Sequence, residues 1–292
     1  MNSGLRPRGG FKMIQDLASL VAATPELAAM PATTARLLQL LEEPDAPVDE
    51  ILAIIEKDPG LTANLLKLSN SAYYGLLREV GSVREALVMM GNRTVVTLAF
   101  AASMGRLLQA PVTAYRLPRG RLWRHALATG LLAARLESSE ADTARRNRIF
   151  TAGVVHDLGK LLLDRPLREV LEQIPPDLDH AGLVAAERQL LGFDHAEAGA
   201  ALAEAWNFPV DLVQVIRGHH ETAETCSVAA IVRAADLMVS AHGHHGGAPT
   251  VAPEDVAVAL EVAGISADEG EDVAGQALRD LDGMMTLLGA DV

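Results

Sequence analysis

Cysteine, aromatic side chains and long uncharged stretches are all scarce in this sequence of 292 residues. The only cysteine, Cys226, can form neither an internal disulfide nor a cysteine-based zinc site, and a chain so poor in cysteine fits the reducing cytoplasm. Aromatic residues make up 3% of the chain, which disfavours an aromatic-rich β-sheet. No stretch approaches the roughly 18 apolar residues of a transmembrane helix, and residues 1–10 lack the apolar core of a secretory signal. We therefore expect a cytoplasmic protein without membrane insertion.

Basic residues are also in the minority. The chain has 25 lysines and arginines against 38 aspartates and glutamates, which gives a formal net charge of −13. Such a charge opposes broad contact with phosphates of nucleic acids, so no nucleic-acid partner is expected. The remaining composition, with 49% hydrophobic and 22% charged residues, is that of an ordinary globular protein.

Apolar residues recur at spacings of three and four along nearly the whole chain, as in Leu61, Leu65 and Leu68. This spacing places them on one face of an α-helix, and we find no convincing β-strand. The sequence therefore predicts an all-α fold in which an N-terminal helical bundle packs on a second helical half. In the second half, helices are expected at about 122–136, 149–156, 183–191, 196–206, 210–217 and 227–240.

Prolines and glycines divide the chain further. Pro111 and Pro118 interrupt the helical pattern and mark the boundary between the two halves. A loop with His242, His244 and His245 can bind metal adventitiously, but we expect its glycines to leave it unordered and give it little weight. The last forty residues hold ten acidic residues and one arginine, and we expect them to be helical. The expected divisions are a flexible tail at 1–14, the N-terminal half at 15–110, the second half at 111–240, the loop at 241–252 and the acidic helical segment at 253–292.

The most informative segment is His156-Asp157-Leu158-Gly159-Lys160, which follows an apolar helix. One interpretation is a helix C-terminus, with a histidine near the negative end of the helix dipole and a turn at Gly159. Lys160 would then be a solvated charge after the helix. This interpretation is favoured for an isolated His-Asp pair.

The pair is not isolated, because other imidazoles and carboxylates occur in the same half of the chain. Taken singly, each of them is better explained as a helix cap or as a satisfied core residue. Together they offer the nitrogen and oxygen donors that divalent Fe, Mn, Mg, Ni or Zn accept, and the absence of thiolates leaves the identity of the metal open. The set consists of His125, His156, Asp157, His195, His219, His220 and Asp236.

Further motifs accompany this set. They are Met30-Pro31-Ala32-Thr33, Lys57-Asp58-Pro59-Gly60-Leu61-Thr62, Asn70-Ser71-Ala72-Tyr73-Tyr74-Gly75, Ser82-Val83-Arg84-Glu85-Ala86, Leu191-Gly192-Phe193-Asp194-His195-Ala196-Glu197 and Trp206-Asn207-Phe208-Pro209. His125, His156-Asp157 and Asp236 resemble the metal-binding pattern of the HD superfamily of phosphohydrolases. The motifs resemble those of the HDOD domain, the HD-related output domain of bacteria, and the resemblance covers about residues 20–240.

The resemblance implies an all-helical HDOD-type fold and a place in bacterial signalling. HDOD domains are generally regarded as non-catalytic relatives of the HD enzymes. The related HD-GYP phosphodiesterases hydrolyse cyclic di-GMP at a site with two or three metal ions. Residues 221–226 of this chain carry no Gly-Tyr-Pro, which disfavours that specific activity.

The resemblance also implies roles for individual residues and a cofactor of one or two divalent metal ions. One ion would be held by His125, His156, Asp157 and Asp236, and a second by His195, His219 and His220, with Asp157 bridging the two. Asp157 and Lys160 would be catalytic only in an enzyme, where Lys160 would face a phosphate and the two ions would activate a water for phosphoester hydrolysis. In a structural site, the same ions would cross-link helices that are distant in sequence.

Two functions follow as alternatives. The first is a bacterial signalling or regulatory domain that is non-catalytic and recognises a protein partner, and the missing Gly-Tyr-Pro favours it. The second is a metal-dependent phosphohydrolase or phosphodiesterase acting on a nucleotide or cyclic dinucleotide, and the complete ligand set favours it. The segment Asn70 to Tyr74 either packs the two halves together or presents Tyr73 and Tyr74 to the partner.

Overall fold

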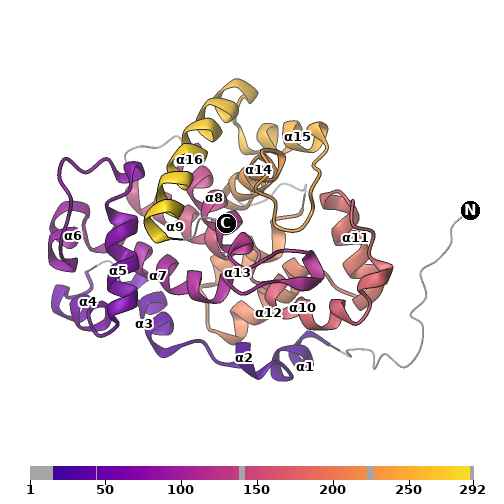
Figure 1. The fold of residues 1–292 in the computed structure, drawn as a ribbon, viewed down its shortest axis with the longest axis horizontal. Helices are drawn as coiled ribbons and strands as arrows, with labels where there is room; N and C mark the ends of the chain where they lie inside the picture. Colours follow the sequence, from indigo (N-terminus) through magenta and orange to yellow (C-terminus); the bar gives the residue numbers. More distant parts are fainter. Residues whose placement is uncertain (1–15, 44, 138–141, 222–226, 290–292) are drawn as a thin grey trace, which may run out of the picture.

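The computed structural model describes residues 16–43, 45–137, 142–221 and 227–289. These residues form an all-α fold, as the sequence predicts, and their only β-structure is two isolated bridges (Figure 1). No helix among them is both long and apolar enough to cross a membrane. The predicted N-terminal tail and the segment 222–226, with Cys226, lie outside the described residues.

The helices fall into three consecutive groups along the chain. The first group is α1 (Leu17–Ala22), α2 (Pro25–Ala28), α3 (Ala32–Leu41), α4 (Val48–Ile55), α5 (Pro59–Ser69), η1 (Ala72–Tyr74), α6 (Val83–Met90), α7 (Asn92–Leu108) and η2 (Thr113–Tyr115). The second is α8 (Arg121–Leu136), α9 (Thr143–Val155), α10 (Gly159–Arg168), η3 (Leu171–Gln173), α11 (His180–Leu191), α12 (His195–Ala205) and α13 (Val210–Gly218). The third is α14 (Ser227–Ala241), α15 (Pro253–Ala263) and α16 (Ala267–Leu288).

Helix α7 joins the two halves. Every residue from Thr94 to Gly105 is buried, and a helix that is buried on all sides belongs to the core. It packs on α3 and α5 of the first group and on α9 of the second (Figure 1). At its C-terminal end, Gly105 lies directly under the ring of Trp123, which leaves no room for a larger side chain.

Helices α1 and α2 pack against α12, although both belong by sequence to the N-terminal half. The indole of Trp206 donates a hydrogen bond of 2.9 Å to the carbonyl oxygen of Leu27. In space, the first described helices therefore lie on the second half, and the chain then crosses to the bundle of α3 to α7 (Figure 1).

The segment Asn70 to Tyr74 lies where the two halves meet. The Asn70 amide bonds both the backbone N–H and the carbonyl of Val80, which closes the loop between α5 and α6. The guanidinium of Arg135, on α8, lies 4.7 Å from the centroid of the Tyr73 ring. Tyr73 therefore takes part in packing the halves, the first of the two roles considered for this segment.

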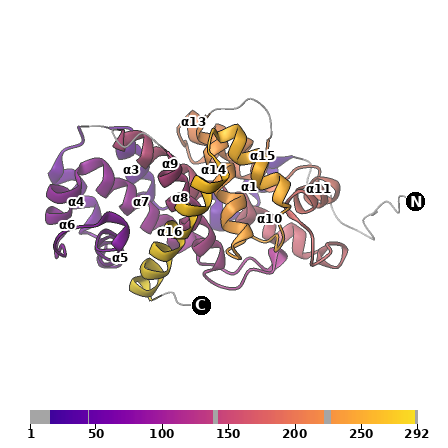
Figure 2. The same cartoon turned by 90° about the horizontal axis from the view of Figure 1, so that it is seen from above.

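The acidic C-terminal helix α16 lies across α8, as the view in Figure 2 shows. Arg124 and Arg135 of α8 form ion pairs with Asp282 and Asp280 of α16. Two of the acidic residues of this helix are thus used to hold it on the second half of the chain.

Candidate metal centre

Seven side chains from five parts of the second half and the third group meet in one buried cluster. His125 is in the second turn of α8, and His156 and Asp157 follow the last residue of α9. His195 opens α12, and His219 and His220 directly follow α13. Asp236 is on α14 and is 2% exposed. The structure thus brings together every residue of the predicted ligand set.

Glycines let the helices that carry these residues approach closely. A Cβ atom on Gly153 of α9 would lie 2.6 Å from Cα of Gly130 on α8. A Cβ on Gly159 would lie 1.8 Å from the carbonyl oxygen of His195, so α10 and the start of α12 require a glycine there. The prediction of a turn at Gly159 was wrong, because the turn spans residues 156–158 and Gly159 begins α10.

His125, His156 and Asp236 form one group of donors. The Nε2 atom of His125 is 3.1 Å from Oδ1 of Asp236 and 3.3 Å from Nε2 of His156. The Nε2 atom of His156 is 3.8 Å from the same carboxylate oxygen. Three lone-pair atoms thus converge within the space that one cation needs.

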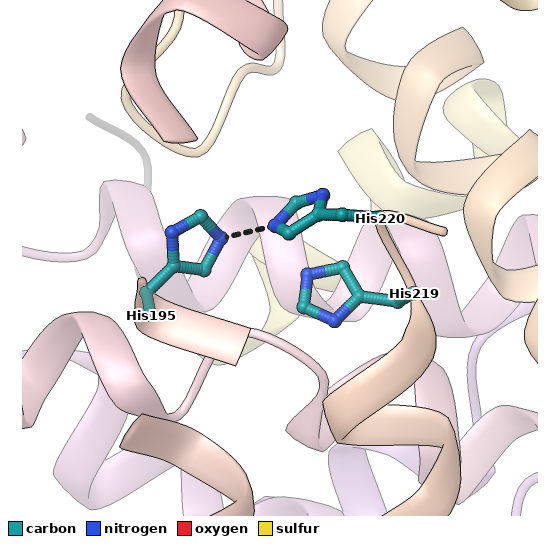
Figure 3. Close-up of side chains that lie close together, drawn as sticks. All are labelled: His195, His219 and His220. Carbon is teal, nitrogen blue, oxygen red and sulfur yellow. Dashed lines mark hydrogen bonds between the residues drawn. The ribbon is translucent and has the colours of Figure 1, made fainter. Parts of the chain in front are cut away.

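His195, His219 and His220 form a second group. Figure 3 shows the three rings around a common point, with Nε2 of His195 and Nε2 of His220 facing each other at 2.7 Å. The Nε2 atom of His219 is buried and has no hydrogen-bond partner.

Asp157 lies between the two groups. Its Oδ2 is 3.3 Å from Nε2 of His125, and its Oδ1 is 3.3 Å from Nε2 of His195 and 3.9 Å from Nε2 of His219. Oδ1 is buried without a hydrogen-bond partner. A buried carboxylate oxygen without a hydrogen-bond partner is costly, and a divalent cation on each side of Asp157 would provide the missing interaction. The residues therefore fit a metal site with Asp157 between two positions.

Four of the five imidazoles of the predicted ligand set are oriented by a hydrogen bond at Nδ1. His125, His156 and His219 lie 2.7 Å from the backbone carbonyl oxygens of His244, Gly153 and Ile216, respectively. The Nδ1 atom of His195 is 2.7 Å from Oε2 of Glu187. An Nδ1–H that donates to such an acceptor leaves the Nε2 lone pair free for a metal. Only His220 of the five has no partner at Nδ1.

The charges in the cluster support cation binding. Burial favours the neutral acid form of both Asp157 and Asp236 and so raises their pKa values. The charges of Lys160 and His156 outweigh burial at Asp157, and interactions with His180 and His125 outweigh it at Asp236. The pKa values of both carboxyl groups therefore lie well below the ordinary range. Burial also disfavours the charged form of His125, yet its bonds to the two aspartates raise its pKa to about 9. Without a metal, the negative charge of the two carboxylates is thus balanced by protonated His125 and by Lys160.

Lys160 is 2% exposed, and its Nζ atom donates to Oδ2 of Asp157 at 2.5 Å. The interpretation of Lys160 as a solvated charge was therefore wrong. The ammonium also lies 5.8 Å from the centroid of the Tyr115 ring, on the inner side of η2.

Several residues of the centre were missed at the level of the sequence. His180 is the first residue of α11, and its Nε2 is 3.0 Å from Oδ2 of Asp236. Glu187 lies seven residues later on the same helix and accepts from both the ring and the backbone N–H of His195. Positions seven apart lie on one helical face, and this was the available signal for the pair.

The glycine-rich loop after α14 also contributes to the centre. The carbonyl of His244 accepts from His125, and a Cβ on Gly246 would lie 2.6 Å from Oδ2 of Asp157. The expectation that its glycines leave this loop unordered, and that it has little weight for the site, was wrong. Gly246 allows the backbone of the loop to lie against Asp157, and His244 contributes its backbone carbonyl oxygen rather than its side chain.

Comparisons with known proteins agree with this fold. An uncharacterized protein of Treponema pallidum is 29% identical over 212 residues, which are 70% of this chain and 39% of that protein, so the chain spans well under half of its relative. The crystal structure of an HDOD domain protein of unknown function from Geobacter sulfurreducens superposes with a TM-score of 0.69 at 20% identity, over 92% of this chain and 97% of that one.

A candidate phosphohydrolase from Shewanella amazonensis SB2B has a TM-score of 0.68 at 24% identity, over 96% of this chain and all of that chain. A candidate metal-dependent phosphohydrolase from the same organism has a TM-score of 0.64 at 18% identity, over 92% and 97% of the two chains. At these identities the likeness shows the fold. Residues 27–222 match the HDOD domain itself, which is two thirds of the chain. The chain belongs to the HDOD domain family.

Proposed function

We propose that this chain is a signalling domain that holds one or two divalent ions as a structural centre and acts by binding a partner protein. The observation that carries the proposal is the burial of the carboxylates of Asp157 and Asp236 against cationic side chains of the chain itself. Lys160 occupies Oδ2 of Asp157 and His180 occupies Oδ2 of Asp236, while Asp157 itself is 1% exposed. Structural metal sites are coordinated by protein side chains alone, whereas catalytic sites keep a position open for substrate, and the burial of both carboxylates favours the structural site.

The donor set consists of imidazoles and carboxylates, so Fe, Mn, Mg, Ni and Zn are all candidates for the ions. Bound ions would tie α8, the end of α9, α12, α13 and α14 together across more than a hundred residues of sequence. The recognition surface for the partner would then be held in shape by the metal centre. The single cysteine fits the cytoplasm, where we expect the domain to act.

The second candidate is a metal-dependent phosphohydrolase acting on a nucleotide or cyclic dinucleotide. It is favoured by one observation, the position of Asp157 between two groups of donors. Two bound ions would supply Lewis-acid stabilisation of a phosphoryl group and a more acidic water. Of the chain's own residues, Asp157 would orient the ions, and Lys160 would offset its charge.

A turnover assay separates the two candidates. The full chain, loaded in turn with Mn²⁺, Fe²⁺ and Zn²⁺, is incubated with nucleotides, cyclic dinucleotides and bis(p-nitrophenyl) phosphate. We expect no hydrolysis above that of the metal alone. Turnover of about 1 per second, in the ordinary range for enzymes, that disappears in His156→Ala and Asp157→Ala would instead establish the phosphohydrolase.

A further inference from the structure

The loop between α14 and α15, residues 242–252, lies against the candidate metal centre. Its His244 carbonyl oxygen is 2.7 Å from Nδ1 of His125. A Cβ atom on Gly246 would lie 2.8 Å from Nε2 of the same ring and 2.6 Å from Oδ2 of Asp157. Such close packing leaves the ring little freedom. The position of the loop therefore decides where Nε2 of His125 lies relative to Asp157.

One side chain of α8, that of Arg124, contacts both this loop and α16. Its Nε donates to Nδ1 of His244 at 3.2 Å, and its Nη2 pairs with Oδ1 of Asp282 on α16. A guanidinium is planar and rigid, so the carboxylate at Nη2 also fixes the direction of Nε–H. The Arg124 side chain is 15% exposed, whereas that of Asp282 is 65% exposed. An exposed residue of α16 thus orients a largely buried arginine toward the loop.

Two further contacts join the loop to the same pair of helices. Nη2 of Arg121, on α8, donates to the carbonyl oxygen of Gly243 at 3.2 Å. Nε2 of His242 is 3.3 Å from Oε2 of Glu271, on α16. Figure 2 shows α16 lying across α8, and the first three residues of the loop are each contacted by a side chain of one of these helices. Helix α16 lies outside residues 27–222, which match the HDOD domain.

We propose that α16 positions the first group of donors of the metal centre. Asp282 orients Arg124, and Arg124 holds His244. The carbonyl of His244 in turn fixes the His125 ring, with Nε2 toward the two carboxylates of the centre. Arg124 and Asp282 are positioning residues, because neither supplies a donor atom to the centre.

The inference rests on the proposed function, since it requires an ion at His125. An imidazole whose Nδ1–H has a fixed acceptor presents the lone pair of Nε2 in one direction, and such outer partners raise the affinity for a metal. The affinity of the centre for its ion therefore depends on a helix outside the matched region. Loss of the contact at Asp282 would leave every ligand in place and still weaken binding.

The chain offers a matched control in Asp280, two residues before Asp282 on α16. Asp280 pairs with Arg135, which is also on α8. The guanidinium of Arg135 lies over the Tyr73 ring, and none of its hydrogen bonds reaches the described residues 242–247 of the loop. Both aspartates thus link α16 to α8, but only Asp282 is connected to His125. If α16 merely stabilised the fold, substitutions of the two aspartates would have equal effects on the centre.

Competition with a chromophoric chelator measures the affinity of the full chain for Mn²⁺. Asp282→Ala should weaken binding about three- to tenfold, less than the roughly 10- to 100-fold effect of removing a direct partner of a ligating histidine. Arg124→Lys should weaken it at least as much, because an ammonium group lacks the planar fork that contacts Asp282 and His244 together. Asp280→Ala should bind Mn²⁺ as the wild type does. Circular dichroism checks that each variant keeps its fold.

Nuclear magnetic resonance of the His125 ring provides a readout that does not depend on the metal. The Nδ1–H signal of His125 is recorded in the full chain with and without Zn²⁺, and its absence in His125→Gln assigns it. We expect this signal to shift and to exchange faster with water in Asp282→Ala, because its acceptor carbonyl is less firmly held. In Asp280→Ala the signal should be that of the wild type.

An unchanged His125 signal in Asp282→Ala, or equal effects of Asp282→Ala and Asp280→Ala, would overturn the inference. A wild type that binds Mn²⁺ no better than Asp282→Ala does would also overturn it and leave the proposed metal centre standing. A wild type that binds no ion, but whose His125 signal shifts in Asp282→Ala alone, would do the reverse. It would refute the proposed function and leave the positioning of His125 by α16 standing.

Discussion

Glu187 orients the His195 ring, because one of its carboxylate oxygens lies 2.7 Å from Nδ1 of His195 and 2.8 Å from the backbone nitrogen of the same residue. Burial lowers the pKa of His195, but the charge of Glu187 more than compensates, and the pKa is raised to about 9. The same contact fixes Nε2 toward Asp157. Glu187 is therefore a positioning residue for the second group of donors.

Glu187→Gln should lower the affinity for Mn²⁺ about 10- to 100-fold, the usual effect of removing an outer partner of a ligating histidine. Competition with a chromophoric chelator measures the affinity, and circular dichroism reports whether the fold is kept. Glu56→Gln, an exposed position after α4, is the control. An unchanged affinity in Glu187→Gln would show that Glu187 does not orient His195 toward a metal.

At the same scale, the sequence predicts some of the centre and misses the rest for a physical reason. His156-Asp157 and His219-His220 are adjacent pairs, and donors at such positions stand out without any knowledge of the fold. The spacing of His180 and Glu187 places both on one helical face, but the contact of His180 with Asp236 follows only from the packing of α11. The carbonyl of His244 cannot be predicted from residue types at all, because any residue supplies one.

At the scale of elements, Asp58 links two helices of the N-terminal half. It caps α5 by accepting from the N–H of Leu61 at 3.0 Å, and both its oxygens accept from Arg106 of α7, at 2.6 and 2.8 Å. The hydrogen bonds from Arg106, followed by that from Leu61, lower its pKa from 3.8 to about 2. Because the folded protein holds the ionised form, this contribution to stability is complete above about pH 4 and is lost as the pH falls toward 2.

Asp58→Asn should keep the helix cap, since asparagine also caps well, and lose the ion pair. We expect the free energy of unfolding at pH 7 to fall by about 1 kcal/mol or less, because the Arg106 side chain is 47% exposed. The deficit should shrink between pH 4 and pH 3. Urea titrations at pH 7, 5, 4 and 3 measure it, with the exposed Asp49→Asn as the control. A deficit that grows on acidification would contradict the pKa.

The occurrence of helices can be predicted along most of this chain, because the apolar spacing repeats over many residues. The contacts between the helices cannot be predicted in this way. Helix α10 was not expected, since Gly159 suggests a turn. Its glycine is required instead by the His195 carbonyl of α12, a contact between residues 36 positions apart. A contact between helices that are distant in sequence cannot be predicted from the residues around Gly159 alone.

At the scale of the whole molecule, the candidate centre lies where segments from residue 125 to residue 246 converge. The N-terminal bundle contributes none of the seven predicted ligands and reaches the second half through α7 and Tyr73. This division suits a domain in which one half forms the metal centre and the other provides surface for a partner.

The most direct test of the metal centre is elemental analysis by inductively coupled plasma mass spectrometry. The full chain is purified without nickel resin from cells supplied with Mn, Fe and Zn, alongside Asp157→Ala and the exposed control Asp177→Ala. We expect one or two equivalents of divalent metal per chain in the wild type and in the control, and a loss of most of the metal in Asp157→Ala. Substoichiometric metal that does not fall in Asp157→Ala would contradict this expectation.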